Sequence, residues 1–183
     1  MYNSIIAKEN KMNPLLLSDE YLDLVDERDQ VIGKKKRSEV YGLNLSNFRV
    51  INAFVVNSKG QLWIPRRSKI KKIFPLCLDM SVGGHVESGE SYDEAFMRET
   101  QEELNLNIND VHWESIAYLT PQKDGVSAFM KIYLIKSDRT PQYNKNDFLE
   151  FFWILPDELA KRIKNGERVK SDLPKLLSAI FGV

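Results

Sequence analysis

The stretch GHVESGESYDEAFMRETQEELN, residues 84–105, decides how this chain is interpreted. Its second half predicts a helix over residues 92–104, because Ser91 and Glu94 form a capping box in which each side chain accepts a backbone N–H of the first turn. Asn105 is expected to end the helix, since after glycine it is asparagine that best tolerates a left-handed backbone. The helix therefore has a defined beginning and end before any tertiary contact is considered.

Three acidic side chains fall on one face of this helix. Glu102 and Glu103 lie three and four residues after Glu99, so the three carboxylates are neighbours on the helix surface. Like charges at these spacings repel by roughly 0.2–0.5 kcal/mol per pair, and a divalent cation between them reverses the sign of that interaction. Mg²⁺ prefers hard oxygen ligands together with phosphate oxygens of a substrate. The alternative is a solvated acidic face, the commoner meaning of E-x-x-E-E on a helix.

Features next to the helix favour the metal site over the solvated face. Arg98 precedes the acids and is expected to pair with Glu90, which would join the preceding loop to the helix. Gly83 and Gly84 lie where a strand is expected to turn sharply and to leave a backbone carbonyl free for a metal ion. The sequence therefore predicts a metal-binding helix with a structured loop at its entrance.

Strands are predicted on both sides of this segment. Their ranges are 21–25, 31–35, 48–56, 61–66, 78–82, 111–119, 126–135 and 148–154. A turn is expected at 122–125, and further helices are expected from Pro156 to Gly166 and over 173–180. The order of strands, one helix, strands and helices indicates an α+β fold, with a mixed sheet packed against helices.

The composition excludes several classes of partner. The chain of 183 residues carries 26 Lys plus Arg and 26 Asp plus Glu, so it lacks the basic surplus expected for binding to nucleic acid or to an anionic membrane. Its apolar runs are too short to span a bilayer. Cys77 is the one cysteine and allows no internal disulfide, which fits a reducing compartment. We expect a cytoplasmic protein with an N-terminal arm at residues 1–17 and a single domain over 18–183.

The segment as a whole resembles the Nudix box, G-x5-E-x7-R-E-U-x-E-E-x-G-U, in which U is an aliphatic residue. Its first glycine, its arginine and its glutamates are matched by Gly84, Glu90, Arg98, Glu99, Glu102 and Glu103. Thr100 replaces an aliphatic residue and Asn105 replaces the second glycine, and neither departure touches a charged position. The resemblance covers roughly residues 18–170, and a match of this length is highly specific. It implies the Nudix α/β/α sandwich, a mixed sheet between helices.

The resemblance also implies a reaction and a cofactor. Nudix hydrolases cleave a diphosphate linkage by attack of water at phosphorus with Mg²⁺, and Mn²⁺ is the alternative ion here. The implied metal ligands are Glu99, Glu102, Glu103 and a carbonyl near Gly84. Either Glu102 or Glu103 is expected nearest the attacking water, with Arg98 and Glu90 completing the catalytic motif. The general base varies within the family, so Glu150 and Asp147 stay open as alternatives.

The expected partner is a small-molecule diphosphate, a nucleoside diphosphate joined to another group. Arg66 and Arg67 are the candidates for binding its phosphates, and only one is expected to reach it because adjacent strand residues point to opposite faces. His85 is expected to be a loop residue with a hydrogen-bonding role. The oligomeric state stays open, and a homodimer is the arrangement that many relatives adopt.

Two other readings of the resemblance lead to different activities. The N-terminal half is also similar to isopentenyl-diphosphate isomerases, whose catalytic cysteine lies two residues before the histidine of a C-G-H motif. This chain has Gly83 at that position and keeps only His85, which disfavours the isomerase. A non-catalytic domain that senses a nucleotide typically loses acids of the box, and none is lost here.

Overall fold

The computed structural model describes residues 19–183, so the predicted arm at residues 1–17 lies outside the described residues. The strands are β1 (Tyr21–Val25), β2 (Val31–Lys36), β3 (Arg49–Val56), β4 (Leu62–Arg67), β5 (Val82–His85), β6 (His112–Leu119), β7 (Phe129–Lys136) and β8 (Phe148–Ile154). The helices are α1 (Arg37–Gly42), α2 (Tyr92–Leu104), α3 (Pro121–Asp124), α4 (Pro156–Lys164) and α5 (Leu173–Phe181), with a 3-10 turn at Ile108–Asp110.

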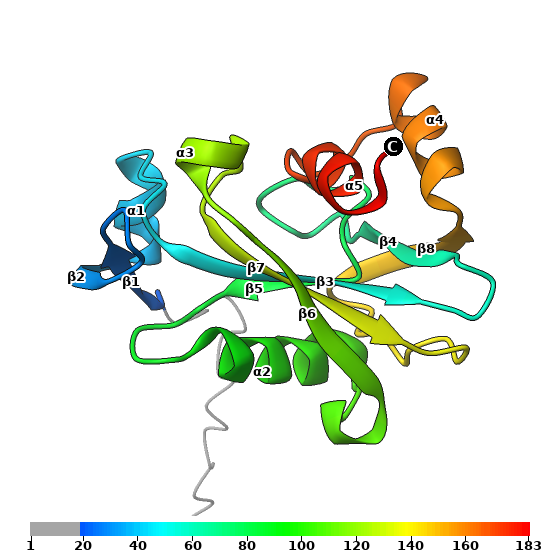
Figure 1. Ribbon diagram of the computed structural model, residues 1–183, viewed down its shortest axis with the longest axis horizontal. Helices are drawn as coiled ribbons and strands as arrows, with labels where there is room; N and C mark the ends of the chain where they lie inside the picture. The colour runs from blue at the N-terminus through cyan, green and yellow to red at the C-terminus, as the bar shows by residue number, and fades with distance from the viewer. Residues whose placement is uncertain (1–18) are drawn as a thin grey trace, which may run out of the picture.

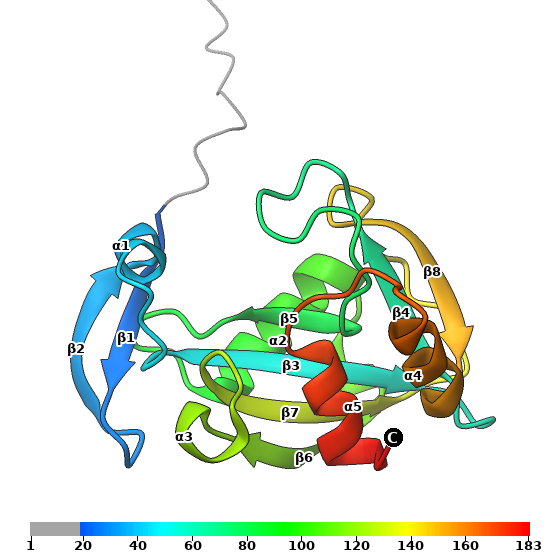
Figure 2. The same cartoon turned by 90° about the horizontal axis from the view of Figure 1, so that it is seen from above.

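The main sheet is mixed and has helices on both faces, which confirms the predicted α+β class and sandwich. Its strand order is β6-β7-β3-β4-β8, and β5 pairs with β3 beside this path. The β3–β7 pair is parallel, and the other pairs are antiparallel. Helix α2 lies under one face, and α4 and α5 lie over the other (Figure 1). The β1–β2 hairpin and α1 form a separate lobe at one end of the sheet (Figure 2).

Strand β3 divides the core into two layers because successive side chains point to opposite faces of a sheet. Ile51, Ala53 and Val55 pack with the α2 residues Ala95 and Phe96. On the opposite face lie Phe54 and the apolar side of α5, which contributes Leu173, Leu176 and Leu177. All of these side chains are buried, so each face of β3 is covered by a helix that shows its own apolar stripe.

Local signals placed α2 correctly. Ser91 accepts the Glu94 N–H at 3.3 Å, and a Glu94 carboxylate oxygen accepts the Ser91 N–H at 2.8 Å. Asn105 has φ 50° and ψ 36°, the left-handed conformation expected at the end of the helix. The capping box and the helix boundary are therefore confirmed.

Other predictions were wrong where pairing partners decide the structure. The strand predicted at 78–82 begins instead at Val82, because residues 82–85 pair with residues 50–53 of β3. Leu78 makes only isolated bridges, to Arg66 and to Val169. Gly83 and Gly84, where a sharp turn was predicted, lie instead inside strand β5. The turn expected at 122–125 is the one-turn helix α3, and α1 escaped detection because six residues show too little periodicity.

Among residues 19–183, no helix is both long enough and apolar enough to cross a membrane.

Candidate active site

Glu99 occupies the space that a side chain at position 84 would need. A Cβ built on Gly84 would lie 1.9 Å from Glu99 Oε1 and 2.0 Å from its Cδ. The glycine is therefore required by this close approach of α2 to β5. Burial raises the pKa of Glu99 to about 7, against the opposing effect of Arg98.

Glu103 lies one helical turn further along and reaches the edge of β5. Its Oε2 accepts the backbone N–H of Gly83 at 3.1 Å, and its side chain is buried. Burial raises the pKa of this carboxyl well above its usual range. Peptide groups alternate in direction along an antiparallel strand, so the N–H and C=O of Gly83 point away from β3, and those of Gly84 point toward it. The backbone groups that face Glu103 are thus those of Gly83.

Arg98 joins the loop, the helix and the strand. Its Nε donates to Glu90 Oε1 at 2.8 Å and its Nη2 to Glu90 Oε2 at 2.9 Å, which is the predicted pair in its bidentate form. The guanidinium also donates to Glu99 Oε1 at 2.8 Å and to the His85 carbonyl at 2.9 Å. This hydrogen bonding lowers the pKa of Glu90, so Glu90 stays ionised. Arg98 and Glu90 therefore position Glu99.

Replacing Arg98 with methionine is expected to lower the free energy of unfolding by about 2 kcal/mol, because the largely buried Glu90 and Glu99 lose their shared cation. Urea unfolding at pH 7.5 measures this change. Lys136→Met, which breaks an exposed pair with Glu114, is the matched control and should change stability by less than about 1 kcal/mol. Equal effects of the two substitutions would contradict the positioning role of Arg98.

The three predicted metal-ligand side chains share a helix turn but face different surroundings. Glu99 and Glu103 are mostly buried, whereas the Glu102 side chain is 59% exposed and lies 3.8 Å from Arg98. Across residues 19–183, no three acidic, histidine or cysteine side chains already converge on one metal position. The donor set nevertheless fits a hard divalent cation, because two carboxylates that burial makes costly to ionise lie against the two glycines of β5.

Two further residues lie beside this site: Glu20, from the N-terminal lobe, and His85, from β5. Glu20, which precedes β1, is partly buried, and its charge contributes to raising the pKa of Glu99. His85 lies in β5, so the prediction of a loop residue was wrong. Its hydrogen-bonding role is confirmed by the contact of Nε2 with the Tyr41 hydroxyl at 2.9 Å. Burial lowers the pKa of His85 to about 3, which keeps the ring neutral. Sequence spacing carries no signal for Glu20.

The predicted phosphate-binding arginines already bind carboxylates. Arg66 donates to Glu150 at 2.5 Å and to Glu167 at 3.0 Å. Arg67 donates to the buried Asp79 at 2.6 Å. The candidate base Glu150 is thus held in an ion pair, and the other candidate, Asp147, is paired with Lys71. Neither carboxylate belongs to the group of acids that α2 places beside β5.

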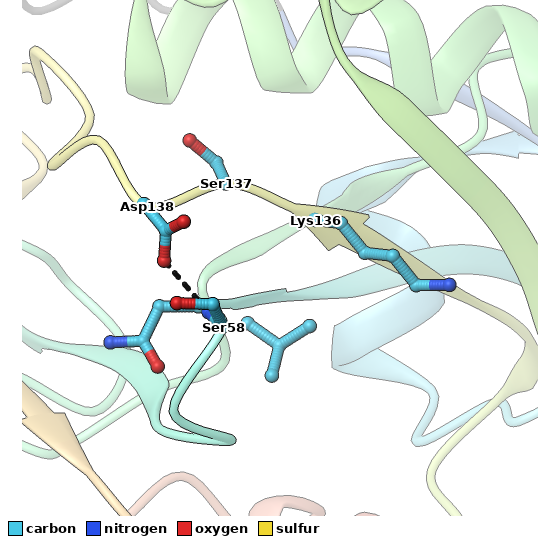
Figure 3. A pocket seen from close by; sticks show the side chains of 6 residues that line it. Ser58, Lys136, Ser137 and Asp138 are labelled. Atoms are coloured by element: carbon cyan, nitrogen blue, oxygen red, sulfur yellow. Dashed lines mark hydrogen bonds between the residues drawn. The ribbon is translucent and has the colours of Figure 1, made fainter.

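A cavity of about 380 Å³ lies elsewhere, at the ends of β3 and β7. Figure 3 shows Ser58, Lys136, Ser137 and Asp138 around it. Asp138 accepts the Ser58 N–H at 2.7 Å and so caps the turn after β3. This cavity is separate from the acids, because β5 pairs with the other end of β3.

Comparison with known proteins identifies the family that this site defines. The NUDIX domain model matches residues 47–174. An uncharacterized Nudix hydrolase of Nostoc sp. strain PCC 7120 is 60% identical over 162 residues, which cover 88% of this chain and 96% of the relative. The crystal structure of DR0079 from Deinococcus radiodurans superposes with a TM-score of 0.85 at 47% identity, covering 88% of this chain and 99% of that one. The chain belongs to the Nudix hydrolase family and is an enzyme of that class.

More distant similarity links the chain to isomerases. The isopentenyl-diphosphate Delta-isomerase of Salmonella heidelberg is 26% identical over 141 residues, 75% of this chain and 78% of the relative. At Gly83, the position that corresponds to the cysteine of the C-G-H motif described above, an added Cβ would meet Asn52 Oδ1 at 2.8 Å and Lys170 Nζ at 3.2 Å. Other side chains thus fill the space that the cysteine would need.

Proposed function

We propose that the protein hydrolyses the diphosphate bond of a nucleoside diphosphate joined to another group, by attack of water at phosphorus, with Mg²⁺ or Mn²⁺. The observation that carries the proposal is the pair of buried carboxylates, Glu99 and Glu103, held against Gly83 and Gly84. Arg98 is the cation at hydrogen-bond distance from Glu99, and Glu103 accepts a hydrogen bond from the Gly83 N–H. Ionising both buried carboxylates is therefore costly, and binding of divalent ions offsets this cost.

In this proposal the residues have different roles. Glu99, Glu102 and Glu103 hold the ions, together with a backbone carbonyl near Gly84, for which the peptide alternation favours Gly83. The bound ion neutralises phosphate oxygens and lowers the pKa of a bound water. Exposed Glu102 is the carboxylate best placed to accept a proton from the attacking water. The ion pair with Arg66 makes Glu150 a weaker base candidate.

A substrate panel tests the proposal. ADP-ribose, dinucleoside polyphosphates, nucleotide sugars, nucleoside triphosphates and isopentenyl diphosphate are each incubated with the protein and Mg²⁺, and products are separated by anion exchange. Cleavage of a nucleotide is expected with Mg²⁺ and not with EDTA. Glu102→Gln should melt like the wild type, because the side chain is exposed, and should lose at least about tenfold in kcat.

Other outcomes of the panel would overturn the proposal. Double-bond migration in isopentenyl diphosphate without hydrolysis would indicate an isomerase. Tight nucleotide binding without turnover would indicate a sensor. Activity of Glu102→Gln within tenfold of wild type would remove Glu102 from the catalytic group and leave Glu103 as the acid nearest the water.

A further inference from the structure

Lys170 lies on the face of β5 opposite α2. The backbone segment that carries it is anchored by hydrogen bonds. The Leu78 N–H donates to the Arg168 carbonyl at 2.8 Å, and the Lys170 N–H donates to the Leu78 carbonyl at 2.9 Å. These two bonds fix the residues that lead from α4 into α5 alongside the segment that leads into β5 (Figure 2). The backbone of Lys170 is therefore held in place, unlike that of a lysine in a free surface loop.

The lysine shares its one carboxylate partner with a second cation. Lys170 Nζ lies 3.3 Å from Asp79 Oδ1, and Arg67 Nη1 lies 2.6 Å from Asp79 Oδ2. Asp79 is buried and supplies one negative charge to two cations. Lys71, whose charge also acts on Glu103, has its own carboxylate in Asp147. Asp79 therefore has two cationic partners, and it would stay paired with Arg67 without Lys170.

A buried acceptor, the Oδ1 atom of Asn52, faces the same side of Gly83 as the Lys170 ammonium group. Lys170 Nζ and Asn52 Oδ1 both lie over Gly83, at 3.2 Å and 2.8 Å from where its Cβ would be. Asn52 is 2% exposed, and its Oδ1 has no hydrogen-bond partner among the described residues. A buried acceptor in this condition costs free energy, and a small movement of the neighbouring Lys170 ammonium group would supply the missing donor. Asn52 is also the one polar side chain within the apolar run Val50–Val56.

Gly83 connects this position with the predicted metal ligands. Its N–H donates to Glu103 Oε2 at the edge of β5 that faces away from β3. Within residues 19–183, β5 pairs with β3 alone, so this edge is not covered by another strand. Glu103 approaches the edge from the α2 side, and Lys170 approaches Gly83 from the other face.

We propose that Lys170 is a substrate-binding residue, whose ammonium group binds a phosphate oxygen of the diphosphate across β5 from Glu99 and Glu103, with Asn52 positioning the ammonium group. The proposal rests on the proposed function, because it places the diphosphate at the same edge of β5. Arg67 then acts chiefly by keeping Asp79 paired, so that Lys170 is available to the substrate.

Binding and kinetics of three lysine variants test this role. Lys170→Met is expected to raise KM for a substrate found in the panel at least about tenfold, with a smaller change in kcat, and to weaken calorimetric binding of methylenediphosphonate in Mg²⁺ by a similar factor. Lys170→Arg keeps the charge and should stay within about threefold of wild type. Lys131→Met is the matched control, because Lys131 has similar exposure, pairs with Asp93 and lies on β7, which β3 separates from β5.

A purely structural role for Lys170 gives a different result. If its only task were to neutralise Asp79, Asp79→Asn in the Lys170→Met background would restore methylenediphosphonate binding, and Lys170→Met alone would lower the melting temperature. Wild-type affinity in Lys170→Met, restoration in the double variant, or a wild type that does not bind the diphosphonate would each overturn the proposal. A wild type that binds it but hydrolyses nothing in the panel would overturn the proposed function alone.

Discussion

Replacing Glu99 with glutamine is expected to lower kcat by on the order of a thousandfold without unfolding the protein. The amide keeps an oxygen that can accept the Arg98 hydrogen bond, but it removes the charge that a divalent ion requires. Steady-state kinetics at saturating Mg²⁺, with circular dichroism as the check on folding, measure this effect. Full activity in the glutamine variant would remove Glu99 from the metal site.

The same substitution is expected to stabilise the metal-free protein at alkaline pH. The pKa of Glu99 is raised to about 7 in the folded protein, from its usual 4.5. The folded state thus holds the proton more tightly, so stability declines as pH rises from about 4.5 to about 7 and stays low above that. The full effect is about 3 kcal/mol. In EDTA, Glu99→Gln should therefore unfold at higher urea than wild type at pH 8 and show a smaller difference at pH 4.5.

Comparing the stability of the variant and the wild type at the two pH values distinguishes the cost of a buried charge from the effect of side-chain packing. A glutamine variant that is less stable than wild type at both pH values would mean that packing, rather than the cost of a buried charge, governs this position. Glu103 is also buried with a raised pKa, so some decline of stability with pH should persist in the variant.

Replacing Gly84 with alanine is expected to lower kcat/KM at least about a hundredfold, since the new methyl group would overlap the Glu99 carboxylate. The side chain of Glu99 has to turn away, because its Oε1, Cδ and Cγ would lie only 1.9, 2.0 and 2.4 Å from the new Cβ. Folding should survive, because the atoms in the way belong to a side chain with rotatable bonds. Kinetics and thermal melting of the same preparation distinguish the two effects.

Gly33→Ala is the control for this change, because nothing lies within 4 Å of a Cβ built on Gly33. It should leave activity unaltered. Wild-type activity in Gly84→Ala would show that catalysis does not need the observed approach of Glu99 to β5.

Features determined by near neighbours in the chain were predictable. Helix α2 begins at a capping box and ends at a left-handed Asn105, and both depend on contacts within four residues. The spacing of Glu99, Glu102 and Glu103 on one helix turn follows from the same periodicity. The pair between Glu90 and Arg98 spans eight residues and was also predictable from the motif.

Features determined by pairing between distant segments were not predictable. The start of β5 depends on β3, about thirty residues away, so the strand was predicted four residues too early. Arg66 and Arg67 were the candidates for binding phosphate, with only one of them expected to reach it. Their ion pairs, which involve Glu150, Glu167 and Asp79, arise only in the folded chain.

The sequence by itself therefore determined the helix, its caps and the order of its acidic residues, because these depend on backbone geometry over a few residues. The tertiary structure alone decided which carboxylates are buried, which glycine each one contacts and which cations share a carboxylate. Burial and charge balance depend on side chains that fold together from distant parts of the chain, such as Lys170 beside Asn52 and Gly83. No local pattern encodes that juxtaposition.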